Sequence, residues 1–166
     1  MSISMHSASA PIFVRLLTAM LGWLDKAQAH AEARKFETSG YLNMKLAPDM
    51  LPLLRQIQIC SDGAKGCMAR LAGVDIPKWE DNEASLDDLR ARIRKTIDFV
   101  QSVPAAQVDG TEAKEIVLQM RAGEVKMTGE NYLRFYALSN FYFHATTAYT
   151  LLRHAGVDIG KKDFLA

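Results

Sequence analysis

The stretch GENYLRFYALSNFYFHATTAYTLLRHAG, residues 129–156, decides the fold of this chain. No Pro or Gly interrupts it between its ends, and Gly156 suits the left-handed position that closes many helices. At about 100° of rotation per residue, a helix here collects both apolar and polar side chains on one face. The members of that face are Leu133, Ala137, Asn140, His144, Thr147, Ala148 and Leu151. The spacing predicts one continuous helix, with Asn140 and His144 buried and directed towards the second long helix of the chain.

The polar members of this face allow two interpretations. A buried amide or imidazole costs free energy unless it finds hydrogen-bond partners. Asn140 and His144 therefore either satisfy each other within the core or line a pocket in which water satisfies them. The sequence leaves both interpretations open and identifies no substrate.

Three further segments repeat apolar residues at intervals of three and four, which is the period of an amphipathic helix. They span about residues 9–35, 48–71 and 85–104. Ser85 with Asp88 three residues later suits the start of the third of these segments. Four amphipathic helices joined by short or moderate loops predict an all-α protein, a four-helix bundle.

The segment before the last helix leaves the helical period. EIVLQM (115–120) and EVKMT (124–128) alternate in polarity and are joined by a turn that contains a glycine. This pattern predicts a small β-hairpin near residues 115–127, inserted before the last helix. An isolated hairpin is marginal in water, so we expect it to pack on a helix end or on a partner.

The third helical segment carries a run of basic residues. Arg90, Arg92, Arg94 and Lys95 are spread around it, away from its apolar stripe. A run of this kind is usually a solvated face, and we expect that here in preference to a binding patch.

Composition bounds the class of protein. The 166 residues fit one domain, 1–166, and 49% of them are apolar, so a substantial core is available. A formal net charge of +1 argues against nucleic-acid binding, which needs a basic excess. No apolar run reaches the roughly 18 residues of a membrane span, and the N-terminus lacks the pattern of a signal peptide. We therefore expect a cytoplasmic protein without membrane contact.

Two cysteines, Cys60 and Cys67, are seven residues apart in the second helical segment. On a helix they would lie about 10 Å apart along the axis, too far for a disulfide. We expect small buried thiols in a reducing compartment.

Few inward groups are capable of chemistry. Asn140 and His144 lie one turn apart on the last helix, and Tyr136 lies close to the same face. Gln56 lies beside the apolar stripe of the second segment, so it either faces the same pocket or is a boundary residue with a backbone partner. An imidazole titrates near neutral pH, so His144 suits general acid or base catalysis.

Four stretches of the chain carry a resemblance to a known family. They are APDMLPLLRQIQ (47–58), ARLAGVDIP (69–77), TGENYL (128–133) and NFYFHATTAYTLLRHAGVDIGKKDF (140–164). Together they closely resemble a group of bacterial and fungal proteins of unknown function in the DinB/YfiT-like metalloenzyme superfamily. The resemblance covers nearly the whole chain and implies an up-down-down-up four-helix bundle that is commonly a homodimer.

The same resemblance implies where a metal would bind. In the wider superfamily, one His on the second helix and a His-x3-His pair on the last helix hold the ion. His144 matches the final His, whereas Asn140 and Gln56 stand where the other two belong. An amide is a poor ligand for zinc or nickel because it is neutral and binds only through its carbonyl oxygen. We therefore do not favour a divalent metal and expect well under one equivalent of zinc or nickel in purified protein.

The sequence supports three hypotheses for function. The first is a pocket at Gln56, Tyr136, Asn140 and His144 that binds a small polar ligand, with His144 as a catalytic acid or base. The second is a non-catalytic dimeric interaction module with a structural polar core. The third is residual binding of a divalent cation by His144 and water.

Overall fold

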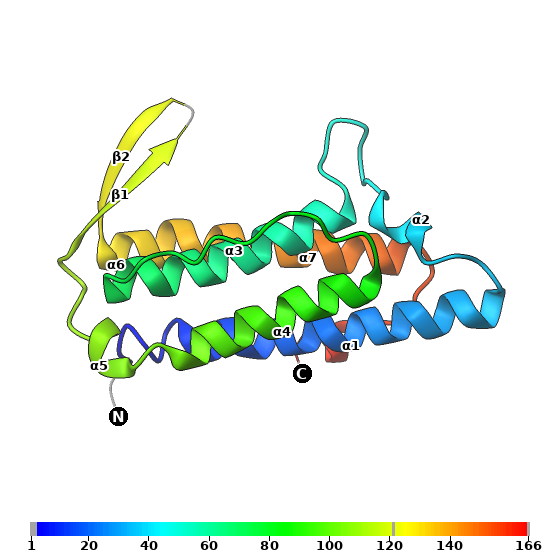
Figure 1. Ribbon diagram of the computed structural model, residues 1–166, viewed down its shortest axis with the longest axis horizontal. Coiled ribbons are helices and arrows are strands. Elements are labelled where there is room, and N and C mark those ends of the chain that lie inside the picture. Colours follow the sequence, from blue (N-terminus) through cyan, green and yellow to red (C-terminus); the bar gives the residue numbers. More distant parts are fainter. Residues whose placement is uncertain (1–2, 121, 166) are drawn as a thin grey trace.

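The computed structural model describes residues 3–120 and 122–165, and its long helices lie side by side (Figure 1). They are α1 (Ala10–Arg34), α3 (Leu53–Ala72), α4 (Leu86–Ser102) and a last rod composed of α6 (Gly129–Asn131), η1 (Tyr132–Ala137) and α7 (Leu138–His154). In Figure 1, α1 and the last rod run in one direction, and α3 and α4 run in the other. Helix α3 packs against α4 and α7, and α1 packs against α4 and α7 from the opposite side.

Short elements connect and close these rods. They are α2 (Ser39–Leu42), α5 (Ala105–Val108) and α8 (Lys161–Leu165). The predicted helical class is confirmed, since helices make up most of the described chain. In the part of the chain that the structure describes, no helix is long and apolar enough to cross a membrane.

The predicted hairpin is also confirmed. Strands β1 (Glu115–Met120) and β2 (Gly123–Thr128) are antiparallel and pair along their whole lengths. The hairpin rises from the end of the molecule where the last rod begins (Figure 1). Two alternate side chains of β1, Ile116 and Leu118, are buried and join the hydrophobic core. The hairpin is therefore fixed to the helices through one face of β1.

The last rod differs from the continuous α-helix that the sequence predicts. Its residues Tyr132–Ala137 form a π-helix, η1, in which each turn holds an extra residue. Beyond it the buried face is centred on Phe141, Ala145 and Ala148, and Asn140 and His144 lie at the edge of that face and are only half-buried. The prediction that Asn140 and His144 are buried is wrong for this reason. Their predicted direction is confirmed, because both lie against α3.

The apolar tail packs against α1. Val157 and Ile159 are buried directly after the last rod. Phe164 of α8 stacks on Trp23 of α1, with 5.5 Å between the ring centroids. These contacts attach the C-terminal segment to the helices.

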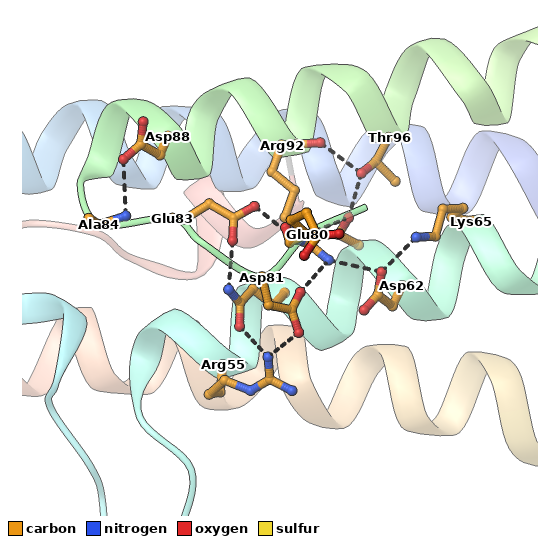
Figure 2. A network of polar contacts seen from close by, with 12 residues as sticks. Arg55, Asp62, Lys65, Glu80, Asp81, Glu83, Ala84, Asp88, Arg92 and Thr96 are labelled. Carbon is orange, nitrogen blue, oxygen red and sulfur yellow. Dashed lines mark hydrogen bonds and ion pairs between the residues drawn. The ribbon is translucent and has the colours of Figure 1, made fainter. Parts of the chain in front are cut away.

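The segment between α3 and α4 runs back along α3 and is held by a buried arginine (Figures 1 and 2). The side chain of Arg92 on α4 is only 2% exposed, and its guanidinium lies 2.8–3.0 Å from the carboxylates of Asp62, Asp81 and Glu83. We call these four residues the Arg92 cluster. Two of its carboxylates belong to the returning segment, so the cluster fastens that segment across α3 and α4.

The expectation of a solvated basic face on α4 is therefore wrong for two of its members. Arg92 lies in the Arg92 cluster, and Arg90 is buried with carboxylates of α1 and α4, Asp25 and Asp87, at 2.9 and 2.6 Å. The expectation is confirmed for Arg94 and Lys95, which are exposed. Apart from Asp87, which lies three residues before Arg90 on α4, the carboxylate partners come from other segments, and charge spacing on α4 could not reveal them.

Both cysteines behave as predicted. Cys60 and Cys67 are free and fully buried. Burial raises the pKa of the Cys67 thiol to about 12, and it raises the pKa of Cys60 as well. Both side chains therefore stay protonated at neutral pH and pack as small apolar groups.

Candidate functional site

A cavity of about 230 Å³ lies between α3, the start of the last rod and the hairpin. Its walls are Ile59, Asp62, Gly63 and Arg70 of α3, Tyr132, Tyr136, Ala137 and Asn140 of the last rod, and Leu118, Gln119 and Met120 of β1. The π-helix η1 forms one wall, and π-helical turns frequently occur at functional sites. This cavity therefore combines an unusual backbone segment with several polar side chains.

Two of the predicted site residues, Tyr136 and Asn140, line this cavity. The Tyr136 ring stacks on Tyr132, with 5.9 Å between centroids, and its hydroxyl lies 3.7 Å from the Met120 sulfur. The amide nitrogen of Asn140 lies 3.9 Å from the point where a Cβ on Gly63 would sit. Within the described residues the Asn140 side chain makes no hydrogen bond, so its amide is available to a ligand or to water.

The other two predicted residues, Gln56 and His144, form a hydrogen bond with each other. His144 Nδ1 lies 2.7 Å from Gln56 Oε1, and Gln56 Nε2 donates to the Leu51 carbonyl at 2.8 Å. Because the carbonyl can only accept, the amide nitrogen must face Leu51 and the amide oxygen must face the imidazole. Nδ1 of a neutral His144 therefore carries the proton, and Nε2 is left as an acceptor.

Burial lowers the pKa of His144 below its ordinary value. The imidazole is therefore neutral at pH 7, in the tautomer that the hydrogen bond to Gln56 selects. A neutral imidazole with a free Nε2 acceptor can take a proton from a bound molecule. Gln56 itself is 1% exposed and has the backbone partner that the sequence offered as an alternative.

The structure thus divides the four predicted residues into two pairs. Tyr136 and Asn140 are in the cavity, whereas Gln56 and His144 lie next to it, with His144 one helical turn beyond Asn140. No hydrogen bond joins Asn140 to His144 within the described chain. His144 is satisfied by α3 and not by its neighbour on the last rod.

Sequence reasoning missed two charged residues of the cavity, Asp62 and Arg70. Asp62 lies nearly opposite the apolar stripe of α3 on a helical wheel, which hid its role, and Arg70 had no assigned role. The glycine at position 66 was the sequence feature that could have pointed to Arg70. In the structure, a Cβ at Gly66 would sit only 2.5 Å from Nη1 of Arg70, so a larger residue would displace the guanidinium. The guanidinium lies against the bare backbone, where Nη1 donates to the Tyr132 hydroxyl at 3.3 Å. Burial raises the pKa of Tyr132, so this hydroxyl stays protonated.

Two larger grooves border Trp79 in the returning segment, with volumes of about 550 and 570 Å³. The Trp79 ring lies between the ammonium groups of Lys65 and Lys95, at 4.1 and 4.7 Å from its centroid. Arg92 and its carboxylate partners, which line these grooves, already hold one another. Arg70 lines the second of these grooves as well as the smaller cavity, so its side chain borders both.

The side chains at the position of the superfamily metal do not fit a transition-metal ion. Nδ1 of His144 is engaged by Gln56, and both Gln56 and Asn140 are neutral amides. Across residues 3–120 and 122–165, no three His, Cys, Asp or Glu side chains are grouped as a metal site requires.

Comparisons with known proteins agree with this architecture. Residues 5–165 match the model of a family described as "Domain of unknown function (DUF1993)". The chain belongs to this family. It is also similar to the crystal structure of a DinB family member from Shewanella denitrificans, at 36% identity and a TM-score of 0.89, over 97% of this chain and 91% of that one. No curated protein matches the chain significantly. The resemblance to an uncharacterised DinB-like family is confirmed, and its members' names give no activity.

Proposed function

We propose that this chain binds a small polar molecule in the cavity between α3 and the last rod. Tyr136 and Asn140 contact the ligand, and His144, held by Gln56, exchanges a proton with it as a general acid or base. The proposal rests on one observation: the Asn140 amide is half-buried in the cavity wall and has no hydrogen-bond partner among the described residues. Polar groups of that kind are retained where a ligand or water satisfies them.

The geometry around His144 supports its role. A general base needs a lone pair within reach of the ligand and a fixed orientation. The chain of hydrogen bonds from Leu51 through Gln56 fixes the ring and leaves Nε2 free. The lowered pKa of His144 keeps that lone pair available at neutral pH.

The scaffold in this proposal is a single domain, an up-down-down-up four-helix bundle. The two opposed pairs of long helices in Figure 1 support it. A cytoplasmic location is part of the same proposal, and the two buried, protonated thiols support it.

Replacement of Asn140 by Leu tests the ligand site. Because the Asn140 side chain has no hydrogen-bond partner in the part of the chain that the structure describes, the free energy of unfolding of the variant should lie within about 0.5 kcal/mol of that of the wild type. Ligand-detected NMR with a library of small polar molecules should find binders of the wild type that the variant has lost. Ser139→Leu, an exposed neighbour on the same helix, is the matched control and should retain binding. A loss of about 2 kcal/mol in Asn140→Leu, without any lost binder, would instead favour a structural polar core.

A second candidate function is a non-catalytic homodimeric interaction module. Two phenylalanines of the last rod favour it, since Phe135 is 66% and Phe143 is 58% exposed. They lie about two helical turns apart, and exposed aromatic side chains are frequent in interfaces. Light scattering after size exclusion should then show a dimer that Phe135→Asp and Phe143→Asp dissociate and that Gln101→Asp, at an exposed position of α4, leaves intact. A wild-type monomer at micromolar concentration contradicts this candidate.

We also expect that the protein does not bind a transition metal stoichiometrically. Freshly purified protein should carry well under one equivalent of zinc or nickel, because amides replace two of the three imidazoles of the superfamily. Elemental analysis after dialysis measures this directly. Stoichiometric metal that disappears in His144→Ala would revive His144 as a ligand of a divalent cation.

A further inference from the structure

We infer that the molecule bound in the cavity is a small carboxylate, and that Arg70 binds its charged group. This inference rests on the proposed ligand site and adds the chemical class of the ligand. It starts from the partners of the basic side chains in the chain.

Six lysine and arginine side chains in the described residues are buried or half-buried: Arg55, Lys65, Arg70, Arg90, Arg92 and Lys114. Four of them form ion pairs with carboxylates. Lys114 donates to the carbonyls at the end of α3, those of Arg70 and Leu71, at 2.9 Å each. Of these six, Arg70 alone has neither a carboxylate nor a carbonyl partner within residues 3–120 and 122–165. Its charge is therefore the one that a ligand can neutralise.

The surroundings of Arg70 explain why no protein group neutralises it. Its Nη1 donates to the neutral hydroxyl of Tyr132, and its guanidinium carbon lies 5.9 Å from the centroid of that ring. Asp62 lines the same cavity, but it accepts from Arg92 and Lys65 at 2.9 Å each. The carboxylate in the cavity wall is thus already held by two cations, and the N–H groups of Arg70 other than Nη1 have no partner among the described residues.

The remaining walls define the rest of the ligand. Asn140 and Tyr136 add an amide and a hydroxyl that can donate to a second oxygen. Apolar walls come from Ile59, Leu118 and Ala137. A guanidinium binds a carboxylate through two parallel N–H groups, and apolar walls favour a hydrocarbon body. One free cation suits a singly charged carboxylate better than a phosphate dianion.

Titration with butyrate tests this inference, with n-butanol as the uncharged analogue and inorganic phosphate as the alternative anion. In amide NMR spectra of the wild type, butyrate should shift the signals of residues around the cavity, with Asn140 and Tyr136 among them. Arg70→Gln should weaken butyrate binding about 10- to 100-fold, the range expected for a lost charge-assisted hydrogen bond. Arg70→Lys should lose only part of the affinity, because lysine keeps the positive charge but lacks the two parallel N–H groups of the guanidinium.

Arg134→Gln is the matched control, because Arg134 is an exposed arginine of η1 that pairs with Glu130 at 2.6 Å. It should bind butyrate as the wild type does. Equal binding of butyrate by Arg70→Gln, stronger binding of n-butanol, or stronger binding of phosphate overturns the carboxylate assignment but leaves a ligand cavity in place. If none of the three probes shifts a cavity residue, the carboxylate inference fails, and the library screen on Asn140→Leu then decides whether the proposed ligand site fails too.

Discussion

Arg92 and Arg70 are both arginines held against α3, yet their surroundings differ completely. Arg92 has three carboxylates within 3.0 Å and a side chain that is 2% exposed. Arg70 is half-buried beside a cavity and has only a neutral phenol as its partner. A buried charge that the protein itself neutralises contributes to structure, and a charge that it leaves unpaired beside a cavity is ready for a ligand.

The Arg92 cluster is a saturated network. Although burial acts to lower the pKa of Arg92, the hydrogen bond that Arg92 donates to Glu83 and the nearby carboxylate charges raise it above its ordinary value. Arg55 also holds Asp81, and Gln58 donates to Glu83 at 2.6 Å (Figure 2). Every charged group of the cluster has at least one partner, so removal of its central cation leaves Glu83 without a cation and leaves Asp62 and Asp81 with one each, Lys65 and Arg55.

Arg92→Met should therefore have the largest effect on stability. Breaking a buried ion pair by removing one partner costs about 3–5 kcal/mol, and the lower figure applies because Asp62 and Asp81 are 44% and 39% exposed. Chemical denaturation measures the loss, which we expect to be about 3 kcal/mol. Arg94→Met, an exposed arginine of the same helix, should change stability by less than about 0.5 kcal/mol. Equal effects of the two substitutions would remove the distinction between a clustered and a solvated arginine.

Acid should weaken the same cluster by a smaller amount. Burial acts to raise the pKa values of Asp81 and Glu83, but hydrogen bonds from Arg55 to Asp81 and from Arg92 to Glu83 outweigh it and lower both. The unfolded chain therefore binds these protons more readily, and stability rises with pH in this range. The contribution is complete above the ordinary values of 3.8 and 4.5 and is lost as the pH falls through the lower folded values.

Denaturation midpoints of the wild type and of Arg92→Met, compared from pH 7 downwards, measure this contribution. The gap between the two proteins should narrow below about pH 4.5, because the carboxylates lose the charge that Arg92 stabilises. The protonation of His144, which also opposes folding in acid, is common to both proteins and cancels in the difference. A gap that stays constant down to the acid transition would contradict the assignment of these carboxylates to Arg92.

The same two arginines show what sequence reasoning could reach. Hydrophobic spacing predicted the helices and the alternating hairpin, because these patterns are local. It placed Asn140 and His144 against α3 but overestimated their burial, since both lie at the edge of the buried face of the last rod. It also missed η1, because no residue of YLRFYA distinguishes a π-helix from an α-helix. Arg92 was predicted to face solvent because its carboxylate partners lie on α3 and on the segment between α3 and α4. The way that segment folds back along α3 cannot be read from local spacing.

The free arginine was in principle easier to find. Gly66 lies four residues before Arg70 on α3, so a small residue and a long cation share one helical face. A helix that contains glycine loses stability relative to alanine, and such a position usually has a packing or functional reason. The sequence could not predict the cavity itself, because β1 and η1 form its other walls over the Gly66–Arg70 face of α3.

Gly66→Ala should have the smallest effect on stability and is the sharpest test of the difference between the two arginines. A Cβ at this position would sit 2.5 Å from Nη1 of Arg70, so the guanidinium must move. Arg70 is the far end of a flexible side chain without an ion-pair partner, and its displacement breaks only a 3.3 Å hydrogen bond to Tyr132. Alanine also favours a helix over glycine by about 0.5–1 kcal/mol.

The two contributions should nearly cancel, and denaturation should find Gly66→Ala as stable as the wild type or slightly more stable. The same protein should bind butyrate less tightly, since the guanidinium no longer occupies its place in the cavity. Gly22→Ala on α1, where a Cβ meets nothing within 4 Å, is the matched control that gains helix propensity without touching Arg70. A clear destabilisation of Gly66→Ala relative to Gly22→Ala would mean that Arg70 is held as firmly as Arg92. It would then be a structural residue in a closed wall, and the cavity would lose its only free cation among the described residues.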